Sequence, residues 1–193
     1  MPAFSSEERQ LLNDSLRDLL ADKYTFEHFK KVARADDGDG FSRPDWATYA
    51  EMGWLGVSLP ESVGGAGGGA TELGIVMAAA GRFLLLEPLL GTIVLGATAI
   101  EQAGTEDQQK LLGDIAEGKL LLAFCHAEPD GGYARDYVRT VAWRDGDGYV
   151  IDGAKAHTIA AHAVDVLVIS ARLGSETGPV AMFLVPRTCA GIK

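Results

Sequence analysis

Apolar residues recur along the first 118 residues with the spacing of about 3.6 residues that places them on one face of an α-helix. The first such stretch opens at Ser5, with Glu8 three residues later. This is the spacing of a capping box, in which each side chain satisfies the other residue's backbone N–H. The pattern predicts one apolar stripe along this helix, made of Leu11, Leu12, Leu16, Leu19 and Leu20. It predicts a second, shorter helix around Phe26, Phe29 and Val32.

The later helices are marked by residues that start or stop a helix. Pro44 suits the first turn of a helix, and Gly53 suits the left-handed conformation that ends it. The remaining helices are predicted over residues 71–86, over residues 89–103, and from a second capping box, Thr105 with Gln108, to Gly118.

From Lys119 onward the spacing of apolar residues changes to the period of two that a β-strand produces. The run Asp145-Gly146-Asp147-Gly148 favours a tight hairpin, because Asp-Gly pairs adopt the positive φ that such turns need. The predicted strands are residues 120–126, 137–143, 149–151, 166–171 and 180–185.

These patterns predict an α+β chain with two domains. Residues 1–118 are expected to form an N-terminal all-α helical domain, and residues 119–193 an antiparallel β-barrel domain. About five short strands rarely close a barrel without leaving unpaired edges. Because Ala190-Gly191-Ile192-Lys193 directly follows an apolar strand, we expect the barrel to be incomplete within this chain.

Composition narrows the class of protein. The 193 residues are 47% hydrophobic, enough for a sizeable core, so the chain is not disordered as a whole. The formal net charge of −10 argues against nucleic acid and anionic membrane surfaces as partners. We see no signal peptide, and the apolar stretches are too short to span a membrane. Two cysteines, Cys125 and Cys189, make no disulfide framework, so we expect a cytoplasmic protein.

Two glycine-rich runs resemble binding motifs. Residues 65–70 match the dinucleotide-binding pattern G-x-G-x-x-[GA], but no strand leads directly into the first glycine and no βαβ alternation surrounds it. We interpret this run as a structural loop. Residues 36–40 resemble a calcium loop in composition only, because the ligand spacing and closing glutamate of an EF-hand are missing. We interpret them as a solvated turn.

The histidines and cysteines do not indicate a metal site or a thiol nucleophile. His157 and His162 have no recognisable ligand spacing, so no metal is expected. Cys125 and His126 are neighbours on a predicted strand and point to opposite faces, which favours a core role for the cysteine. His126 and Glu128 share a face and are expected to reach a bound ligand together.

Several short motifs, taken in order, resemble the acyl-CoA dehydrogenase family over nearly all of the chain. The segment 123–129 is most similar to the small subunit of pimeloyl-CoA dehydrogenase-type enzymes. The motifs are Met52-Gly53-Trp54-Leu55-Gly56, Leu59-Pro60-Glu61, Ala127-Glu128-Pro129 and the run from Asp147 to Lys155.

The resemblance implies an N-terminal helical domain, a middle β domain and a C-terminal four-helix domain, with FAD between the last two. It implies an oxidoreductase that removes the α proton of an acyl-CoA with a carboxylate while the β hydride passes to the flavin. The family's base belongs to the C-terminal domain, so no catalytic residue is expected within these 193 residues. The family also forms dimers and tetramers, and the apolar surface predicted here favours a homologous partner subunit.

The flavin-contacting stretches of the family map onto two segments of this chain. Four positions depart from the usual pattern: Ala127 and Ile159 replace hydroxyl residues, Tyr133 replaces a small serine, and His157 replaces a tryptophan. At about 1 kcal/mol per hydrogen bond, and more where a polar partner is left buried and unpaired, three losses would weaken flavin binding by several orders of magnitude. The expected contacts are Phe124, His126, Ala127, Gly132, Tyr133, His157, Thr158 and Ile159.

Two functions remain open at this stage. The chain is either the N-terminal portion of an FAD-dependent acyl-CoA dehydrogenase, or a non-catalytic small subunit that completes the pocket of a related catalytic subunit. The departures at the flavin positions favour the second role for the chain alone. The family as a whole favours an enzymatic assembly.

Overall fold

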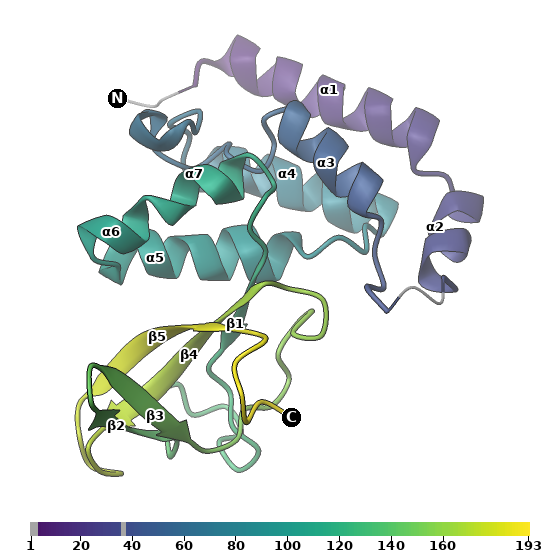
Figure 1. Cartoon of the computed structure of the whole chain (residues 1–193). Helices are drawn as coiled ribbons and strands as arrows, with labels where there is room; N and C mark the ends of the chain where they lie inside the picture. The colour runs from purple at the N-terminus through teal and green to yellow at the C-terminus, as the bar shows by residue number, and fades with distance from the viewer. Residues whose placement is uncertain (1–3, 36–37) are drawn as a thin grey trace.

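The computed structural model describes residues 4–35 and 38–193 and has a helical layer above a curved β-sheet (Figure 1). The N-terminal α-domain followed by a β-domain is as predicted. The helical elements are α1 (Ser6–Lys23), α2 (Phe26–Ala33), α3 (Arg43–Glu51), the 3-10 helix η1 (Glu61–Val63), α4 (Ala70–Phe83), the π-helix η2 (Leu90–Ala97), α5 (Thr98–Ala103), α6 (Glu106–Gln109) and α7 (Leu111–Ala116).

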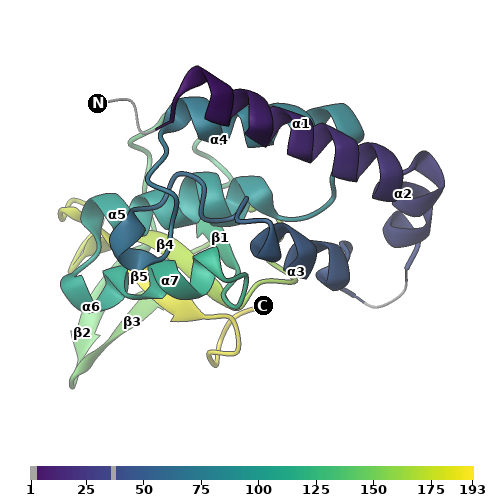
Figure 2. The same ribbon diagram turned by 90° about the horizontal axis from the view of Figure 1, so that it is seen from above.

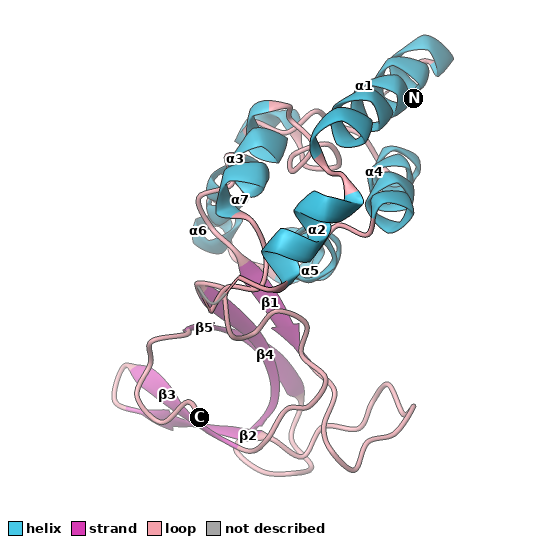
Figure 3. Ribbon diagram, turned by 90° about the vertical axis from the view of Figure 1, so that its right-hand side faces the viewer, coloured by secondary structure: helices cyan, strands magenta, loops and turns pink. Residues whose placement is uncertain are grey.

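The sheet is mixed, which corrects the prediction of purely antiparallel strands. Strand β4 pairs in parallel with β1 and β2, whereas β2–β3 and β4–β5 are antiparallel. Only the antiparallel pairs are joined by hairpins; long connections separate β1, β2 and β4, so local turns do not set their direction. Figure 3 shows that the described strands curve without closing. The strands are β1 (Leu122–Cys125), β2 (Val141–Asp145), β3 (Gly148–Asp152), β4 (Val166–Leu173) and β5 (Val180–Pro186).

The predicted helix starts are confirmed. Ser5 and Glu8 form a capping box, and so do Thr105 and Gln108. Along α1 the apolar stripe is narrower than predicted, since Leu16 and Leu20 are buried but Leu11 is 69% exposed. Only one face of α1 lies against α4 (Figure 2), where the guanidinium of Arg9 donates to the buried carboxylate of Glu72 at 2.6 Å.

The expected helix over residues 89–103 is not uniform, because its first half is the π-helix η2. This helix packs closely on strand β1. A Cβ atom at Gly96 would lie 2.7 Å from the Cβ of Leu122. Thr92 Oγ1 donates to the carbonyl of Leu122 at 3.0 Å and accepts from its N–H at 3.1 Å. The glycine and the threonine thus fix the helical layer to the sheet.

The strand predicted from residue 137 begins only at Val141, because the backbone N–H groups just before it hydrogen bond to the side chain of Glu128 instead of to a neighbouring strand. Both Arg139 and Thr140 donate their backbone N–H groups to the carboxylate of Glu128. The hairpin prediction is confirmed: Asp145 pairs with Gly148, and Gly146 has φ of 58°.

The glycine-rich loop at residues 65–70 is a packed turn. The 3-10 helix η1 precedes it, and no strand runs into its first glycine. A Cβ atom at Gly65 would lie 2.2 Å from the carbonyl oxygen of Leu59, and one at Gly68 would lie 2.4 Å from that of Val57. Close backbone approach therefore explains these glycines. Of the acidic run at 36–40, residues 36 and 37 lie outside the described part of the chain.

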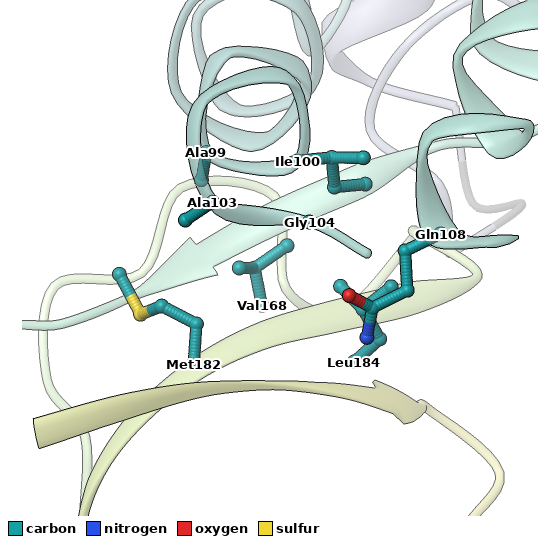
Figure 4. A pocket seen from close by; sticks show the side chains of 8 residues that line it. All are labelled: Ala99, Ile100, Ala103, Gly104, Gln108, Val168, Met182 and Leu184. Atoms are coloured by element: carbon teal, nitrogen blue, oxygen red, sulfur yellow. The ribbon is translucent and has the colours of Figure 1, made fainter. Parts of the chain in front are cut away.

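Within the described residues, no helix has the length and apolarity to cross a membrane, and no cluster of histidine, cysteine and acidic side chains could hold a metal ion. A small apolar hollow lies where α5 meets the sheet (Figure 4) and includes none of the predicted flavin residues. It is lined by Ala99, Ile100, Ala103, Gly104, Gln108, Val168, Met182 and Leu184.

Candidate functional site

The structure brings together the two segments that carry most of the predicted site residues. The end of β1 and the segment 155–159 run side by side: the N–H of Ala156 donates to the carbonyl of Ala127 at 2.8 Å. The Thr158 side chain hydrogen bonds with the buried Cys125. Burial raises the pKa of the Cys125 thiol, as expected for a core cysteine rather than a nucleophile. Phe124, His126 and Ala127 thus share one region with His157, Thr158 and Ile159.

The segment 155–159 ends in an unusual backbone conformation. His157 has φ of 53° and Ala160 has φ of 59°, both in the left-handed region that residues other than glycine seldom occupy. Ile159 is 48% exposed, and its carbonyl lies beside Gly91 of η2, where a Cβ atom would approach it to 3.4 Å. Such strained positions cluster at functional sites, so this turn is a candidate binding element.

The other two predicted residues, Gly132 and Tyr133, lie on the loop 129–136. Gly132 has φ of 51°, which explains the glycine, and the side chain of Tyr133 is fully exposed. The loop joins the site through its backbone, because the carbonyl of Arg135 hydrogen bonds with His126 Nε2 at 2.8 Å. The structure therefore places the loop next to the site without turning Tyr133 into it.

His126 uses both of its ring nitrogens within the protein. Nδ1 lies 2.9 Å from the hydroxyl oxygen of Ser170 on β4, and Nε2 contacts the loop carbonyl of Arg135. The ring also stacks on Phe124, with centroids 6.0 Å apart and an interplanar angle of 29°. The two rings form a flat, half-buried wall at the end of β1.

Glu128 is turned into the interior and does not reach outward with His126 as expected. Its carboxylate accepts from the ammonium of Lys155 at 2.7 Å and from the hydroxyl of Thr140 at 2.7 Å. The backbone N–H groups of Arg139 and Thr140 also donate to it. Burial opposes the ionised form, but these donors prevail and lower the pKa of Glu128 to about 2. Glu128 is therefore a permanently charged structural group.

Lys155 and Ser170 also belong to this site, and the sequence did not predict their contacts. Lys155 stands at the end of a recognised motif, but nothing in the sequence shows that its ammonium contacts Glu128, Ser170 and the carbonyl of His126. Ser170 gives a faint signal, because it is a polar residue inside the otherwise apolar start of β4. It is completely buried.

The sequence matches the family profile described as acyl-CoA dehydrogenase, N-terminal domain, over residues 6–119, which is more than half of the chain. The chain belongs to the acyl-CoA dehydrogenase family. It is 37% identical to the acyl-CoA dehydrogenase FadE12 of Mycobacterium tuberculosis over 97% of its own length and 49% of that protein. It is 30% identical to the benzylmalonyl-CoA dehydrogenase of Aromatoleum aromaticum over 84% of its length and 44% of that enzyme.

Solved structures agree with this assignment. A variant of the steroid acyl-CoA dehydrogenase Tcur3481-Tcur3483 superposes with a TM-score of 0.85 at 30% identity, covering 96% of this chain and 49% of that one. The ChsE4-ChsE5 complex of Mycobacterium tuberculosis gives a TM-score of 0.83 at 26% identity, covering 99% and 50%. The chain thus spans about half the length of the acyl-CoA dehydrogenases it matches.

The side chains of this acyl-CoA dehydrogenase chain match only part of a flavin's surface. The stacked rings of Phe124 and His126 suit the face of a planar ring. Few side chains of these two segments could hydrogen bond to the edge of that ring: the nitrogens of His126 are used internally, Ala127 and Ile159 have no polar group, and the Thr158 hydroxyl contacts Cys125. The exposed ring of His157 is the polar group that remains on the segment 155–159. The hydrogen-bonding edge of FAD therefore fits the side chains present poorly, with too few donors and acceptors to match it.

Proposed function

We propose that this chain forms part of an assembly that dehydrogenates an acyl-CoA thioester to the 2-enoyl-CoA with FAD as the oxidant. The observation that carries the proposal is the adjacency of β1 and the segment 155–159, the two stretches at which the family resemblance places flavin contacts. In this role, Phe124 and His126 provide an apolar wall against the flavin. The segment 155–159 forms the neighbouring edge of the same surface.

The proton-abstracting carboxylate of the proposed reaction comes from another part of the assembly. A general base works best when its pKa is near the working pH. The carboxylate of Glu128, which directly follows β1 and Ala127, has its pKa lowered to about 2 and is surrounded by protein donors. Its part in the reaction is to hold Lys155 and the backbone beneath the site.

The proposal is tested on the protein as its native host assembles it. A tag on the chain allows the intact assembly to be purified and its flavin content measured. We expect one bound flavin per active site, with bleaching of the flavin absorption when a saturated acyl-CoA is added without oxygen. The panel of substrates should include acyl-CoA thioesters with short, long and cyclic acyl groups. If the assembly carries flavin and none of them bleaches the flavin absorption, the proposed function is contradicted.

A second candidate is a non-catalytic subunit that completes the pocket of a homologous catalytic subunit. The shortage of free polar side chains at the predicted flavin surface favours it. Two structural neighbours, Tcur3481-Tcur3483 and the ChsE4-ChsE5 complex, also bear the names of two proteins. Copurification decides between the roles: a homologous flavin-binding partner supports the accessory subunit, whereas stoichiometric flavin on a homomeric protein supports the self-sufficient enzyme.

A further inference from the structure

A continuous chain of hydrogen bonds runs from a buried ammonium group to the loop 129–136. Lys155 Nζ lies 3.0 Å from Ser170 Oγ, which lies 2.9 Å from His126 Nδ1. On the other side of the ring, Nε2 lies 2.8 Å from the carbonyl oxygen of Arg135. The side chain of Lys155 is only 10% exposed and Ser170 is completely buried, so bulk water does not compete for the contacts between Lys155 and Ser170.

The chemistry of the donors and acceptors shows which atom carries the proton in each of these hydrogen bonds. The ammonium of Lys155 has only protons to offer, and it directs them to the carboxylate of Glu128, the carbonyl of His126 and the hydroxyl oxygen of Ser170. Ser170 therefore accepts from Lys155 and has its own proton left for Nδ1 of His126. Independently, the carbonyl of Arg135 only accepts, so Nε2 must carry a proton.

We infer that the Lys155–Ser170 pair holds His126 in the Nε2–H tautomer, and that Ser170 acts through this ring as a positioning residue for the loop 129–136. Two separate contacts, one on each nitrogen, require the same tautomer. The loop carrying Gly132 and Tyr133 is thereby tied to a serine on the central strand β4.

If the chain binds flavin as proposed, the internal hydrogen bonds of His126 determine how its ring contacts a ligand. A histidine whose nitrogens are both engaged offers a ligand only the face of its ring and its C–H edge. The surface at His126 and Phe124 thus selects a flat aromatic system by stacking rather than by hydrogen bonds.

The tautomer is measured directly by long-range ¹H–¹⁵N correlation NMR on the ¹⁵N-histidine-labelled protein at alkaline pH. The signals of His126 are identified by their absence from the His126→Gln spectrum. We expect a protonated Nε2 and an unprotonated, hydrogen-bonded Nδ1. A protonated Nδ1 at His126 overturns the inference, and this result requires neither flavin nor substrate. Failure of the tautomer is therefore distinguishable from failure of the proposed dehydrogenation.

The positioning role is tested by amide hydrogen exchange across residues 131–136. Ser170→Ala removes the partner of Nδ1, and we expect the Nδ1 signal to shift and exchange in the loop to quicken about fivefold to tenfold, as for one ordinary hydrogen bond. His126→Gln can still reach the carbonyl of Arg135 and should keep the protection. His126→Asn is too short to do so and should lose it.

A matched control is His162→Gln, since His162 Nε2 also contacts a backbone carbonyl, that of Asp39. It should leave the exchange of residues 131–136 unchanged. Equal exchange in Ser170→Ala and in the unmodified chain overturns the positioning role. If Ser170→Ala does not fold, the comparison of His126→Gln with His126→Asn decides the matter, and equal exchange in that pair counts against it.

Discussion

Glu87 is a buried carboxylic acid of the helical domain whose ionisation departs strongly from that of a free glutamate. It is 5% exposed, and one of its carboxylate oxygens has no hydrogen-bond partner in the structure, as is also true of the hydroxyl of Tyr49. Burial is the main reason that its pKa is raised to about 7, and the nearby Asp45 adds to the effect. The N–H of Ser42 and the hydroxyl of Tyr24 oppose the shift only in part.

This ionisation predicts that stability falls as the pH rises from about 4.5 to about 7. Over this range the folded state binds a proton at Glu87 that the unfolded state has released, so lower pH favours folding. Glu87→Gln should remove the effect and raise the free energy of unfolding at pH 8 by about 2 kcal/mol, with little change at pH 4.5. Urea unfolding at the two pH values measures this. An equal effect of the substitution at both values would contradict the assignment.

The buried pair of Glu128 and Lys155 predicts a large loss of stability when one partner is removed. Lys155→Met leaves the carboxylate of Glu128 buried without its cation and should lower the free energy of unfolding by about 3–5 kcal/mol. The matched control is Glu176→Gln, which breaks an ion pair with Arg139 in which both side chains are about 60% exposed. That change should cost less than about 1 kcal/mol. Similar losses in the two variants, compared by urea unfolding at pH 7, would count against the buried pair.

Among the elements, the close contact between η2 and β1 decides how the two layers are joined. Gly96→Ala would place a methyl group against Leu122 and should lower the free energy of unfolding by about 1–3 kcal/mol. Gly74→Ala is the control, since a Cβ there meets no atom within 4 Å and the residue lies inside α4. It should stabilise the protein by up to about 1 kcal/mol. Thermal unfolding of both variants tests the contact, and a stabilising Gly96→Ala would refute it.

The same contact shows why the elements were predictable only in part. The capping boxes and the 3.6-residue period are local, so they predicted α1 and the start of α6 correctly. The π-helical turns of η2 depend on how closely Gly96 and Thr92 approach β1, a contact between residues about 30 positions apart. The parallel partners of β4 are likewise determined by packing across long connections.

The candidate site was likewise predictable only in part. Motifs located the two segments that meet, because short runs such as Ala127-Glu128-Pro129 are visible in the sequence. The inward turn of Glu128 and the bond between Ser170 and His126 were not predictable, since each joins residues at least 11 positions apart through tertiary contacts. The resemblance therefore identified the two segments, and the structure showed which side chains within and around them contact each other.

At the scale of the whole molecule, the chain spans about half the length of the relatives it matches, and the predicted flavin contacts of β1 and the segment 155–159 lie in one region. If the proposed function holds, the assembly binds FAD largely through groups outside this chain. Adding hydroxyls at the two positions where the family usually has them should then strengthen binding from this side. Ala127→Thr and Ile159→Ser together should tighten FAD binding to the assembly by about tenfold or more, the effect of one or two new hydrogen bonds.

The measurement is the quenching of flavin fluorescence on titration of the flavin-depleted assembly with FAD. Tyr133→Ser is the contrasting variant: the side chain of Tyr133 is fully exposed, so this change should leave the affinity within about twofold. Tighter binding in the double variant alone would place the flavin against β1 and the segment 155–159. No change in the double variant, or an equal gain from Tyr133→Ser, would mean that the flavin lies elsewhere and that this chain serves the assembly as scaffold.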